Sequence, residues 1–466
     1  ILAQDRVRPG PPSTRTHPTS IHAASMVSRF AAAAAVAGAA VHAAASSCAH
    51  KFAEASYPTF TEFCAQHGLH YTAAELSQRE ATYDAAVKSM KAHNSNPSKT
   101  WTMGVNELTA LTDAEQGALY GMAFSGSSGG GQAPSRKRGG AGAAEVLPDS
   151  WDWREHRPSV VSPVKHQGSC GSCWAFAATA VLESHIAIQT GTLFSLSPQQ
   201  IVSCAPNPNE CGGSGGCSGS TVQLAFNYTK YAGILSEWTY SYTSGVSKEN
   251  GECFPLEGRR VPVANIGGFA NVPKNLAPPL QQALVEHGPV GISVAAGKWS
   301  PYSGGIFPHK DCDYIINHAV TLMGFGAHCE DKYWLIRNSW GPTWGEKGYI
   351  RLERAATPTG EQCGWDTEPM SGSACKKPLD GSNPPEKIWV CGTCGMLADS
   401  TYPTDGSLGA PTPPDDPALA TTASPALAQA RAHSFAGGLP EGAGGTAFFQ
   451  TRGRRVVGAP RAGLEL

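Results

Sequence analysis

The chain lacks an excess of charge of either sign. Its 35 Lys and Arg side chains are balanced by 37 Asp and Glu side chains, which gives a formal net charge of −2. The basic run "RKR" at 136–138 is too short to follow a phosphate backbone. This balance gives no electrostatic basis for binding nucleic acid or an anionic membrane surface. We therefore expect neither nucleic acid nor a membrane among its partners.

The chain also lacks an apolar run long enough to cross a bilayer stably. Met26 is followed by Arg29 and by "FAAAAAVAGAAVHAAASSCA", a short run that is poor in Leu, Ile and Phe. This layout is typical of a secretory signal peptide, and "AAA" at 43–45 offers a cleavage site. We expect a signal peptide at 26–47 and a secretory route that ends outside the cell or in an acidic vesicle like a lysosome or vacuole. We interpret the polar, Pro-rich residues 1–25 as an untranslated or non-native leader.

Shifts in composition divide the rest of the chain. Beyond residue 405, aromatic residues are scarce and Pro, Ala and Gly predominate, so we expect a disordered tail at 405–466. Residues 125–145 have little apolar surface to bury and are predicted to be a flexible linker open to activating cleavage. Between these segments, residues 146–404 carry most of the Trp, Tyr and Cys and can bury a sizeable core. An amino-terminal region remains at 48–124.

The amino-terminal region is predicted to be helical between 57 and 94. Thr72 and Glu75 form a capping-box pair, which marks the start of a helix. The apolar residues that recur at three- and four-residue steps, as on one helix face, are Leu76, Tyr83, Val87 and Met90.

The body combines one long helix with several strands. "WAFAATAVLESHIAIQTG" predicts a helix that ends at Gly191. Short β-rich runs bounded by Gly and Pro follow, namely "GPVGISVAAG", "NHAVTLMGFG", "YWLIRNSWG" and "GYIRLER". A helix-first half followed by a strand-rich half predicts an α+β fold.

Two cysteines stand three residues apart in "QGSCGSCWAF". Cys170 and Cys173 could form a redox couple, half of a metal site, or one structural and one reactive thiol. Cys173 begins the predicted helix, where a helix N-terminus and a nearby imidazolium lower the pKa of a thiol. Two residues in later β-rich runs could complete such a site, His318 as a base and Asn338 as a group that orients the imidazole.

Three blocks carry a family resemblance. "QGSCGSCWAF", "NHAVTLMGFG" and "IRNSWGPTWGEKGYIRL" resemble, in order, the active-site blocks of papain and the cathepsin L group of cysteine proteases. The resemblance extends over about 60–404 and implies that Cys173 is the nucleophile, His318 the base and Asn338 the orienting amide. It also implies that Gln167 donates a hydrogen bond to the oxyanion and that Trp340 covers the Cys–His pair from water.

The same resemblance implies which cysteines pair. The implied disulfides are Cys170–Cys217, Cys204–Cys253 and Cys312–Cys394, which leave Cys173 free. A rival alignment uses Cys363 in place of Cys394, but the match at Cys394 continues through Tyr402 and Pro403. Residues 363–391 are then an insertion. The sequence does not pair the remaining cysteines of the body, which are Cys211, Cys329, Cys363, Cys375 and Cys391.

The amino-terminal region resembles the inhibitory propeptide of the same family. Its helix motif corresponds here to Glu75, Arg79, Tyr83, Ala86, Met90 and Asn94. A second motif corresponds to Gly104, Asn106, Leu108 and Ala110, and the carboxylate that the family has at the last position is absent. The resemblance implies that residues 48–124 inhibit their own peptidase domain.

Substrate recognition is also implied by the resemblance. In this family, specificity depends largely on the pocket for the side chain two residues before the scissile bond. Asp399 corresponds to the floor of that pocket, and Ile316 and Ser293 to its walls. Gly219 and Ser220 correspond to a glycine pair that approaches the substrate backbone, so a side chain stands where the family has a second glycine. Asp399 could instead face solvent or cap a turn, and the rival alignment places Glu368 at the floor.

The sequence therefore predicts a papain-like fold with a helical lobe and a β-barrel-like lobe, preceded by a helical propeptide. We expect a cysteine endopeptidase made as a secreted zymogen, acting as a monomer on protein and peptide substrates. No metal and no organic cofactor are expected. Two alternatives are an inactive homologue that only binds protein, and an exopeptidase in which residues 363–391 intrude on the cleft.

Overall fold

The computed structural model describes residues 52, 54–121 and 147–411, apart from residues 255, 257, 259, 373 and 379. The leader, the expected signal peptide and the expected linker lie outside the described residues. All helices and strands named below belong to one compact unit, which comprises residues 1–254 and 258–413. Residues 255–257 and 414–466 form a second unit, which lies almost wholly outside the described residues.

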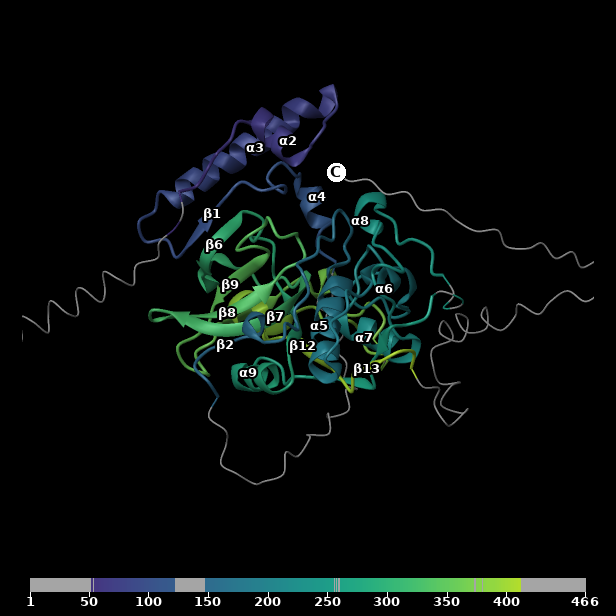
Figure 1. Cartoon of the computed structure of the whole chain (residues 1–466). Helices are drawn as coiled ribbons and strands as arrows, with labels where there is room; N and C mark the ends of the chain where they lie inside the picture. The colour runs from purple at the N-terminus through teal and green to yellow at the C-terminus, as the bar shows by residue number, and fades with distance from the viewer. Residues whose placement is uncertain are drawn as a thin grey trace, which may run out of the picture. The chain divides into compact units, whose positions relative to one another are not determined.

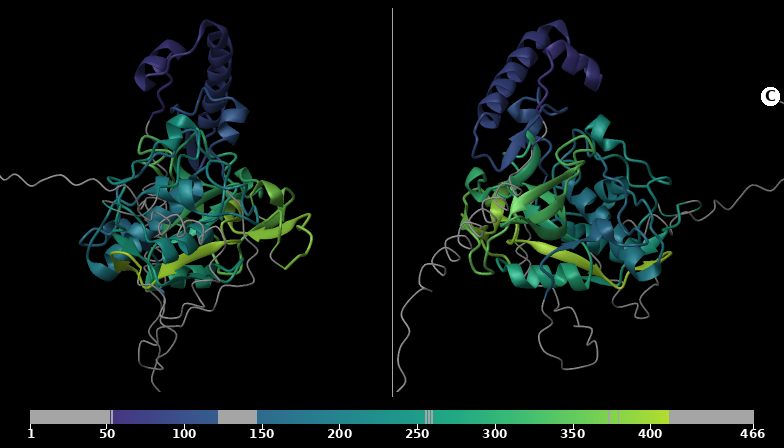
Figure 2. Two further views of the ribbon diagram at one scale, coloured as in Figure 1. Left: turned by 90° about the vertical axis from the view of Figure 1, so that its right-hand side faces the viewer. Right: turned by 60° about the vertical axis from the view of Figure 1, so that its left-hand side comes forward.

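The amino-terminal region contains two packed helices, α2 (Phe60–His67) and α3 (Ala73–Asn94), which lie side by side in Figures 1 and 2. The predicted capping box at the start of α3 is confirmed, since the Glu75 carboxylate accepts a hydrogen bond from the Thr72 backbone N–H at 3.1 Å. A short helix, α4 (Asp113–Gly117), follows.

Burial along the apolar face of α3 is not uniform. The α3 side chains that are buried are Arg79, Tyr83, Val87 and Met90. Leu76 repeats at the same spacing but is 47% exposed. Periodicity gives only the side of the helix, whereas burial depends on what packs against each turn.

A nine-stranded sheet forms the second lobe. Its main path runs in the order β1 (Trp101–Met103), β6 (Tyr302–Phe307), β9 (Tyr349–Glu353), β8 (Asp331–Arg337), β7 (His318–His328), β5 (Val290–Val294), β12 (Ser400–Thr404) and β4 (Gly268–Asn271), with β2 (Trp151–Asp152) paired to β7. All pairs are antiparallel except β6–β9. The amino-terminal region supplies β1, which extends the edge of the sheet beside β6 (Figure 1).

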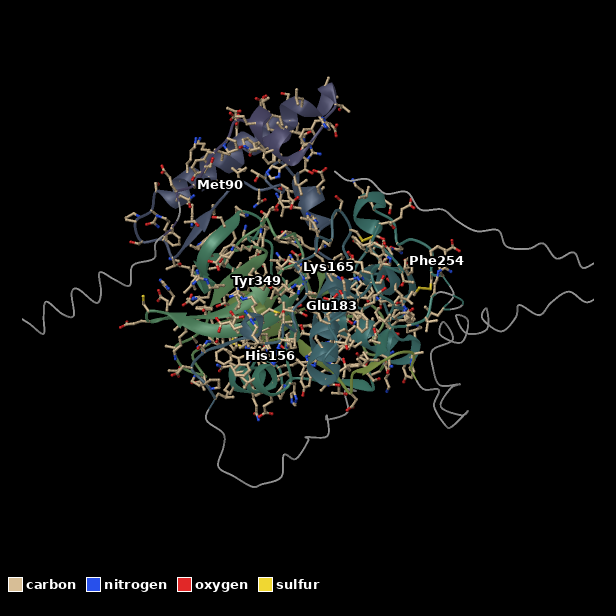
Figure 3. All side chains as sticks on the ribbon, viewed as in Figure 1. Met90, His156, Lys165, Glu183, Phe254 and Tyr349 are labelled. Atoms are coloured by element: carbon tan, nitrogen blue, oxygen red, sulfur yellow. A yellow bond between two sulfur atoms is a disulfide. The ribbon has the colours of Figure 1, made fainter. Side chains whose placement is uncertain are left out.

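The first lobe of the body is built on helix α5 (Cys173–Thr190). This helix ends at Gly191, whose left-handed backbone (φ 74°) suits glycine, as the sequence predicted. Helices α6 (Pro198–Cys204) and α7 (Val222–Ala232) pack against α5. Near its middle, Glu183 is fully buried and accepts a hydrogen bond from Lys165 at 2.8 Å (Figure 3). This ion pair fixes α5 to the segment that precedes the CxxC pair.

Each lobe has its own hydrophobic core. One core surrounds α5 and contains Trp174 and Phe226, and a larger one in the sheet lobe contains Trp299, Trp334 and Trp344. A third, small cluster lies within the amino-terminal region around Phe63. Helix α5 contacts β7, so the start of α5 and the start of β7 meet where the two lobes join. The predicted α+β, two-lobe fold with a helical propeptide is confirmed.

The other elements are short. They are η1 (Trp153–Glu155), α8 (Ser244–Ser247), β3 (Ala264–Asn265), α9 (Ala277–Glu286), η2 (His309–Asp311), β10 (Cys363–Asp366), η3 (Pro369–Ser371), β11 (Ile388–Cys391), η4 (Thr393–Gly395) and β13 (Ser407–Leu408). Strand β13 pairs with β3, so regular structure continues past 405, where the sequence placed the start of a disordered tail.

Within the described part of the chain, no helix combines the length and apolarity needed to cross a bilayer. Over the same residues, no three His, Cys, Asp or Glu side chains are grouped so that they could hold a metal ion.

Candidate active site

Cys173 begins helix α5 and is completely buried. The backbone N–H of Ala319 points to its Sγ at 3.4 Å, so the thiol lies against the start of β7. Its Sγ–H donates to the carbonyl oxygen of Gly121 at 3.0 Å, and Gly121 belongs to the amino-terminal region. The thiol is therefore covered by a segment of its own chain.

His318 is the first residue of β7 and is also fully buried. Its Nε2 lies 2.8 Å from Oδ1 of Asn338, which follows β8. Oδ1 can only accept hydrogen bonds, and it also accepts the backbone N–H of Ser339 at 2.8 Å. The Nε2 atom must therefore carry the proton, which leaves Nδ1 as the proton acceptor. This Nδ1 has no hydrogen-bond partner among the described residues.

Aromatic side chains surround the imidazole. The indole of Trp340 is fully buried and lies 5.0 Å from the His318 ring, at an interplanar angle of 33°. The rings of Tyr120 and Trp299 present edge contacts at 6.0 and 6.4 Å. The first of these comes from the amino-terminal region. These three rings pack around the buried His318 imidazole.

Gln167 lies beside Cys170 of the CxxC pair and is fully buried. The Ser339 hydroxyl donates to its Oε1 at 2.7 Å, which orients the amide group. Its Nε2 donates to the carbonyl oxygens of Cys170 at 2.9 Å and of Leu119 at 2.8 Å. The amide N–H that could stabilise an oxyanion is thus occupied by a carbonyl of the amino-terminal region.

The covering segment, Leu119–Gly121, fits closely enough to require glycine. A Cβ on Gly121 would lie 1.8 Å from the carbonyl oxygen of Gly171, a distance no real side chain tolerates. A Cβ added to Gly219 would lie 3.1 Å from the carbonyl carbon of Gly121, so these two backbones are close together. Any larger residue at 121 would displace the segment from Cys173.

Burial keeps both reactive groups neutral in this form of the chain. Burial raises the pKa of the Cys173 thiol to about 11, although the Ala319 N–H partly offsets that rise. Burial lowers the pKa of His318 to about 4, opposed by its hydrogen bond to Asn338. Both shifts disfavour a thiolate–imidazolium pair while the amino-terminal segment covers the site.

A pocket of about 40 Å³ lies beside the site. Its lining residues are Lys274, Ser293, Ile316, Ile388, Trp389, Val390, Ala398 and Asp399. The structure thus brings together Ser293, Ile316 and Asp399, as the sequence predicted. Asp399 is buried and accepts hydrogen bonds from Gln223 Nε2 at 2.7 Å and Ser293 Oγ at 2.8 Å, so it does not face solvent.

Gly219 and Ser220 lie on the helical lobe, just before α7. Gly219 has φ 91°, and an added Cβ would meet the carbonyl oxygen of Gly212 at 2.1 Å, so only glycine fits there. Ser220 is buried, and its hydroxyl has no hydrogen-bond partner among the described residues. The Ser220 side chain is therefore enclosed by protein, and the backbone that lies near Gly219 is that of Gly121.

The disulfides of the structure include the three pairings implied by the resemblance, Cys170–Cys217, Cys204–Cys253 and Cys312–Cys394. Cys173 is unpaired. Cys312 joins Cys394 and not Cys363, in agreement with the preferred alignment. Asp399 lines the pocket, whereas the exposed Glu368 of the rival alignment lies outside the lining. Two further bonds, Cys211–Cys375 and Cys363–Cys391, hold the insertion. Cys329 is disulfide-bonded too.

Sequence reasoning missed the carboxylate that pairs with Arg79. Arg79 donates hydrogen bonds to both carboxylate oxygens of Glu115, one of them at 2.6 Å, and to the Ala110 carbonyl at 3.0 Å. This guanidinium holds the pKa of Glu115 at about 2. The carboxylate that contacts Arg79 is thus Glu115, five residues beyond Ala110. The capping-box spacing of Thr112 and Glu115 was the signal that could have found it.

Comparison with known proteins gives family matches over two parts of the chain. The family model described as "Papain family cysteine protease" matches residues 147–373, and "Cathepsin propeptide inhibitor domain (I29)" matches residues 60–116. Pro-cathepsin H of Bos taurus is 33% identical over 306 residues, which cover 65% of this chain and 86% of that protein. The structure titled "Recombinant stem bromelain precursor" is similar with a TM-score of 0.57 and 30% identity, over 74% of this chain and 97% of that one.

Other relatives are longer. Cysteine protease 1 of Oryza sativa subsp. japonica is 38% identical over 291 residues, which cover 60% of this chain. The chain spans only 55% of the length of that protein.

Proposed function

Because the chain belongs to the papain family of cysteine proteases, we propose that it is a cysteine endopeptidase made as a zymogen. The observation that carries the proposal is the arrangement of Cys173, His318 and Asn338. The thiol stands at the N-terminus of α5 against the start of β7, where the His318 imidazole begins. The Asn338 amide fixes that imidazole with Nδ1 as the proton acceptor.

The reaction begins once the covering segment has left the site. Without Gly121 and Tyr120 beside them, the thiol and the imidazole become solvated, and the burial that raised one pKa and lowered the other is reduced. The proton of Cys173 then moves to Nδ1 of His318. Helix N-termini stabilise nearby negative charge, so the N-terminus of α5 stabilises the resulting thiolate.

Acyl transfer follows from the positions of these groups. The Cys173 thiolate attacks the scissile carbonyl carbon, and negative charge develops on the carbonyl oxygen. Gln167 Nε2, now released from the Leu119 carbonyl, and the backbone N–H of Cys173 donate hydrogen bonds to that oxygen. His318 returns its proton to the leaving amine, which breaks the peptide bond and leaves a thioester on Cys173.

Hydrolysis of the thioester completes the cycle. Water gives a proton to His318 Nδ1 while its oxygen adds to the thioester carbonyl carbon. The C–S bond then breaks, the carboxylic acid product leaves, and the imidazolium returns the proton to the Cys173 sulfur. Asn338 and Trp340 keep the ring in the same orientation through both half-reactions. No metal and no organic cofactor is needed for any of these steps.

Cleavage within a chain is favoured over removal of terminal residues. The segment Leu119–Gly121 is an internal stretch of polypeptide, and it lies against Cys173 and Gln167. An internal stretch of a substrate can therefore reach the same place. The amino-terminal region acts as an intramolecular inhibitor, since it occupies the thiol, the oxyanion donor and the His318 face at once.

The cysteines support an oxidising compartment. Five disulfides join described residues, and such bonds persist in secreted proteins and in the vesicles of the secretory pathway. We therefore place the protein in that pathway, either outside the cell or in an acidic vesicle, and we expect a monomer.

The Cys173→Ser variant tests the proposed function. The purified wild-type chain is incubated between pH 4 and 7 with an N-terminally blocked dipeptide substrate, with and without an epoxide thiol inhibitor. We expect the wild type to process itself and to cleave the substrate unless the inhibitor is present. The variant should remain a folded, unprocessed chain without activity. Self-processing by the variant would refute the assignment of Cys173, and activity only on substrates with a free terminus would refute an endopeptidase.

A further inference from the structure

The insertion at 363–391 is fixed to both lobes. At its base, Cys363 and Cys391 are joined by a disulfide, and β10 and β11 pair antiparallel between Cys363↔Cys391 and Asp366↔Ile388. In its middle, Cys375 is joined to Cys211, in the loop that links α6 and α7 of the helical lobe. The insertion therefore crosses from the sheet lobe to the helical lobe and returns.

Polar contacts hold both attachments in place. On the helical lobe, Glu210 forms ion pairs with Lys376 at 3.3 Å and Lys377 at 2.5 Å. On the sheet lobe, the Asn275 side chain donates to the Trp389 carbonyl at 3.0 Å and accepts the Cys391 backbone N–H at 2.9 Å. With two disulfides and these hydrogen bonds, β11 has a defined position.

Strand β11 of the insertion supplies one wall of the pocket beside the active site. Ile388, Trp389 and Val390 of β11 line the pocket whose floor is Asp399. Trp389 is 46% exposed, so its indole is only partly covered by protein. The Trp365 ring lies edge-on to it at 4.9 Å, and Lys387 lies over the Trp365 face at 4.3 Å. Trp365 thus supports Trp389 from outside and does not line the pocket.

The charges in the pocket favour an uncharged occupant. Asp399 at the floor and Lys274 at the edge line the same pocket and carry opposite charges when both are ionised. Their sum is close to zero when Asp399 is ionised and positive when Asp399 is protonated. Binding of a cationic side chain therefore depends on the charge of Asp399, whereas binding of an apolar side chain does not. Most of the remaining lining is apolar and is contributed by Ile316, Ile388, Trp389, Val390 and Ala398.

We propose that Trp389 is a specificity-determining residue that packs against the substrate side chain two residues before the scissile bond. The substrates it favours carry a large apolar side chain there, such as Phe or Leu. A half-exposed indole gains most by burying itself against an aromatic or branched aliphatic group, which also contacts Ile316 on the other side. This proposal rests on the proposed function, because it takes the pocket to be the one that receives that side chain.

The test compares Trp389→Ala with Trp365→Ala in the mature enzyme. Three blocked dipeptide substrates carry Phe, Leu or Ala at the tested position and the same residue next to the cleaved bond. We expect Trp389→Ala to lower kcat/KM for Phe about tenfold relative to Ala, chiefly through KM. Trp365→Ala should change that ratio less than about threefold, because its ring supports the indole without lining the pocket. Trp389→Phe should keep most of the preference.

The results of this test separate a failure of the proposed function from a failure of the Trp389 assignment. If the wild type cleaves none of the substrates, the proposed function is wrong. If the wild type cleaves them but Trp389→Ala leaves the Phe-to-Ala ratio unchanged, the assignment of Trp389 is overturned. If the Trp389→Ala variant hydrolyses the Ala substrate, the variant is folded. If it is inactive on all three substrates, the Phe-to-Ala ratio of kcat/KM for Trp389→Phe decides whether Trp389 sets the preference. The assignment of Trp389 is also overturned if Trp389→Phe cleaves the Phe and Ala substrates equally well. It is overturned too if Trp389→Ala and Trp365→Ala lower the Phe-to-Ala ratio equally.

Discussion

Acceptance of Arg in the pocket should depend on pH through Asp399. Its carboxylate is buried and accepts hydrogen bonds from Gln223 and Ser293. Burial raises its pKa to about 6, opposed by the Ser293 hydrogen bond, the charge of Lys274 and the Gln223 hydrogen bond. Asp399 is therefore mostly ionised above pH 6 and becomes mostly protonated as the pH falls below that value.

The size of the effect follows from that pKa. With a pKa of about 6, roughly 10% of the Asp399 side chains are ionised at pH 5 and roughly 90% at pH 7. A substrate guanidinium gains a charge-assisted hydrogen bond only from the ionised form, whereas a Phe side chain gains nothing from it. The ratio of kcat/KM for Arg to kcat/KM for Phe should thus rise about tenfold from pH 5 to pH 7, or about 1.4 kcal/mol.

The assay is a ratio of two substrates measured in the same buffers between pH 4.5 and 8. The substrates differ only in Arg or Phe two residues before the scissile bond, so the titration of Cys173 and His318 cancels. Asp399→Asn should give a flat ratio at the low, acidic value. Glu368→Gln is the matched control, because Glu368 lies outside the pocket lining, and it should leave the curve unchanged. A flat ratio in the wild type, or a slope that survives in Asp399→Asn, would refute the reasoning.

Further predictions concern catalysis, the propeptide and processing. Gln167→Ala should lower kcat about 100- to 1000-fold with little change in KM, because it removes one oxyanion donor; an unchanged kcat in steady-state assays would exclude that role. Arg79→Ala, on a Cys173→Ser background, should weaken the amino-terminal region by about 1–2 kcal/mol, a range that allows for the 35% exposure of the Glu115 side chain. An added protease should then cut that region about tenfold faster, and an unchanged rate would contradict the importance of the Glu115 ion pair. The mature chain should begin between Gly139 and Leu147, and N-terminal sequencing that places the start before residue 125 would disprove this.

Features that depend on neighbouring residues could be predicted from the sequence. The start of α3 at the Thr72–Glu75 capping box and the end of α5 at Gly191 are encoded within a few residues of each helix end. The strands that contain His318 and precede Asn338 follow from short β-rich runs. The grouping of these residues around Cys173 was available only because the order of three motif blocks resembles a known family.

The tertiary structure alone decided the contacts between distant segments. The Cys211–Cys375 bond joins residues 164 positions apart, and nothing local to either cysteine indicates its partner. Leu76 has the spacing of a buried residue but is exposed, whereas Trp389, in an insertion, lines a pocket with Asp399. Gly121 lies against Cys173 although 52 residues separate them. Such contacts depend on how the two lobes and the amino-terminal region pack together, and a side chain meets its partners only after that packing has formed.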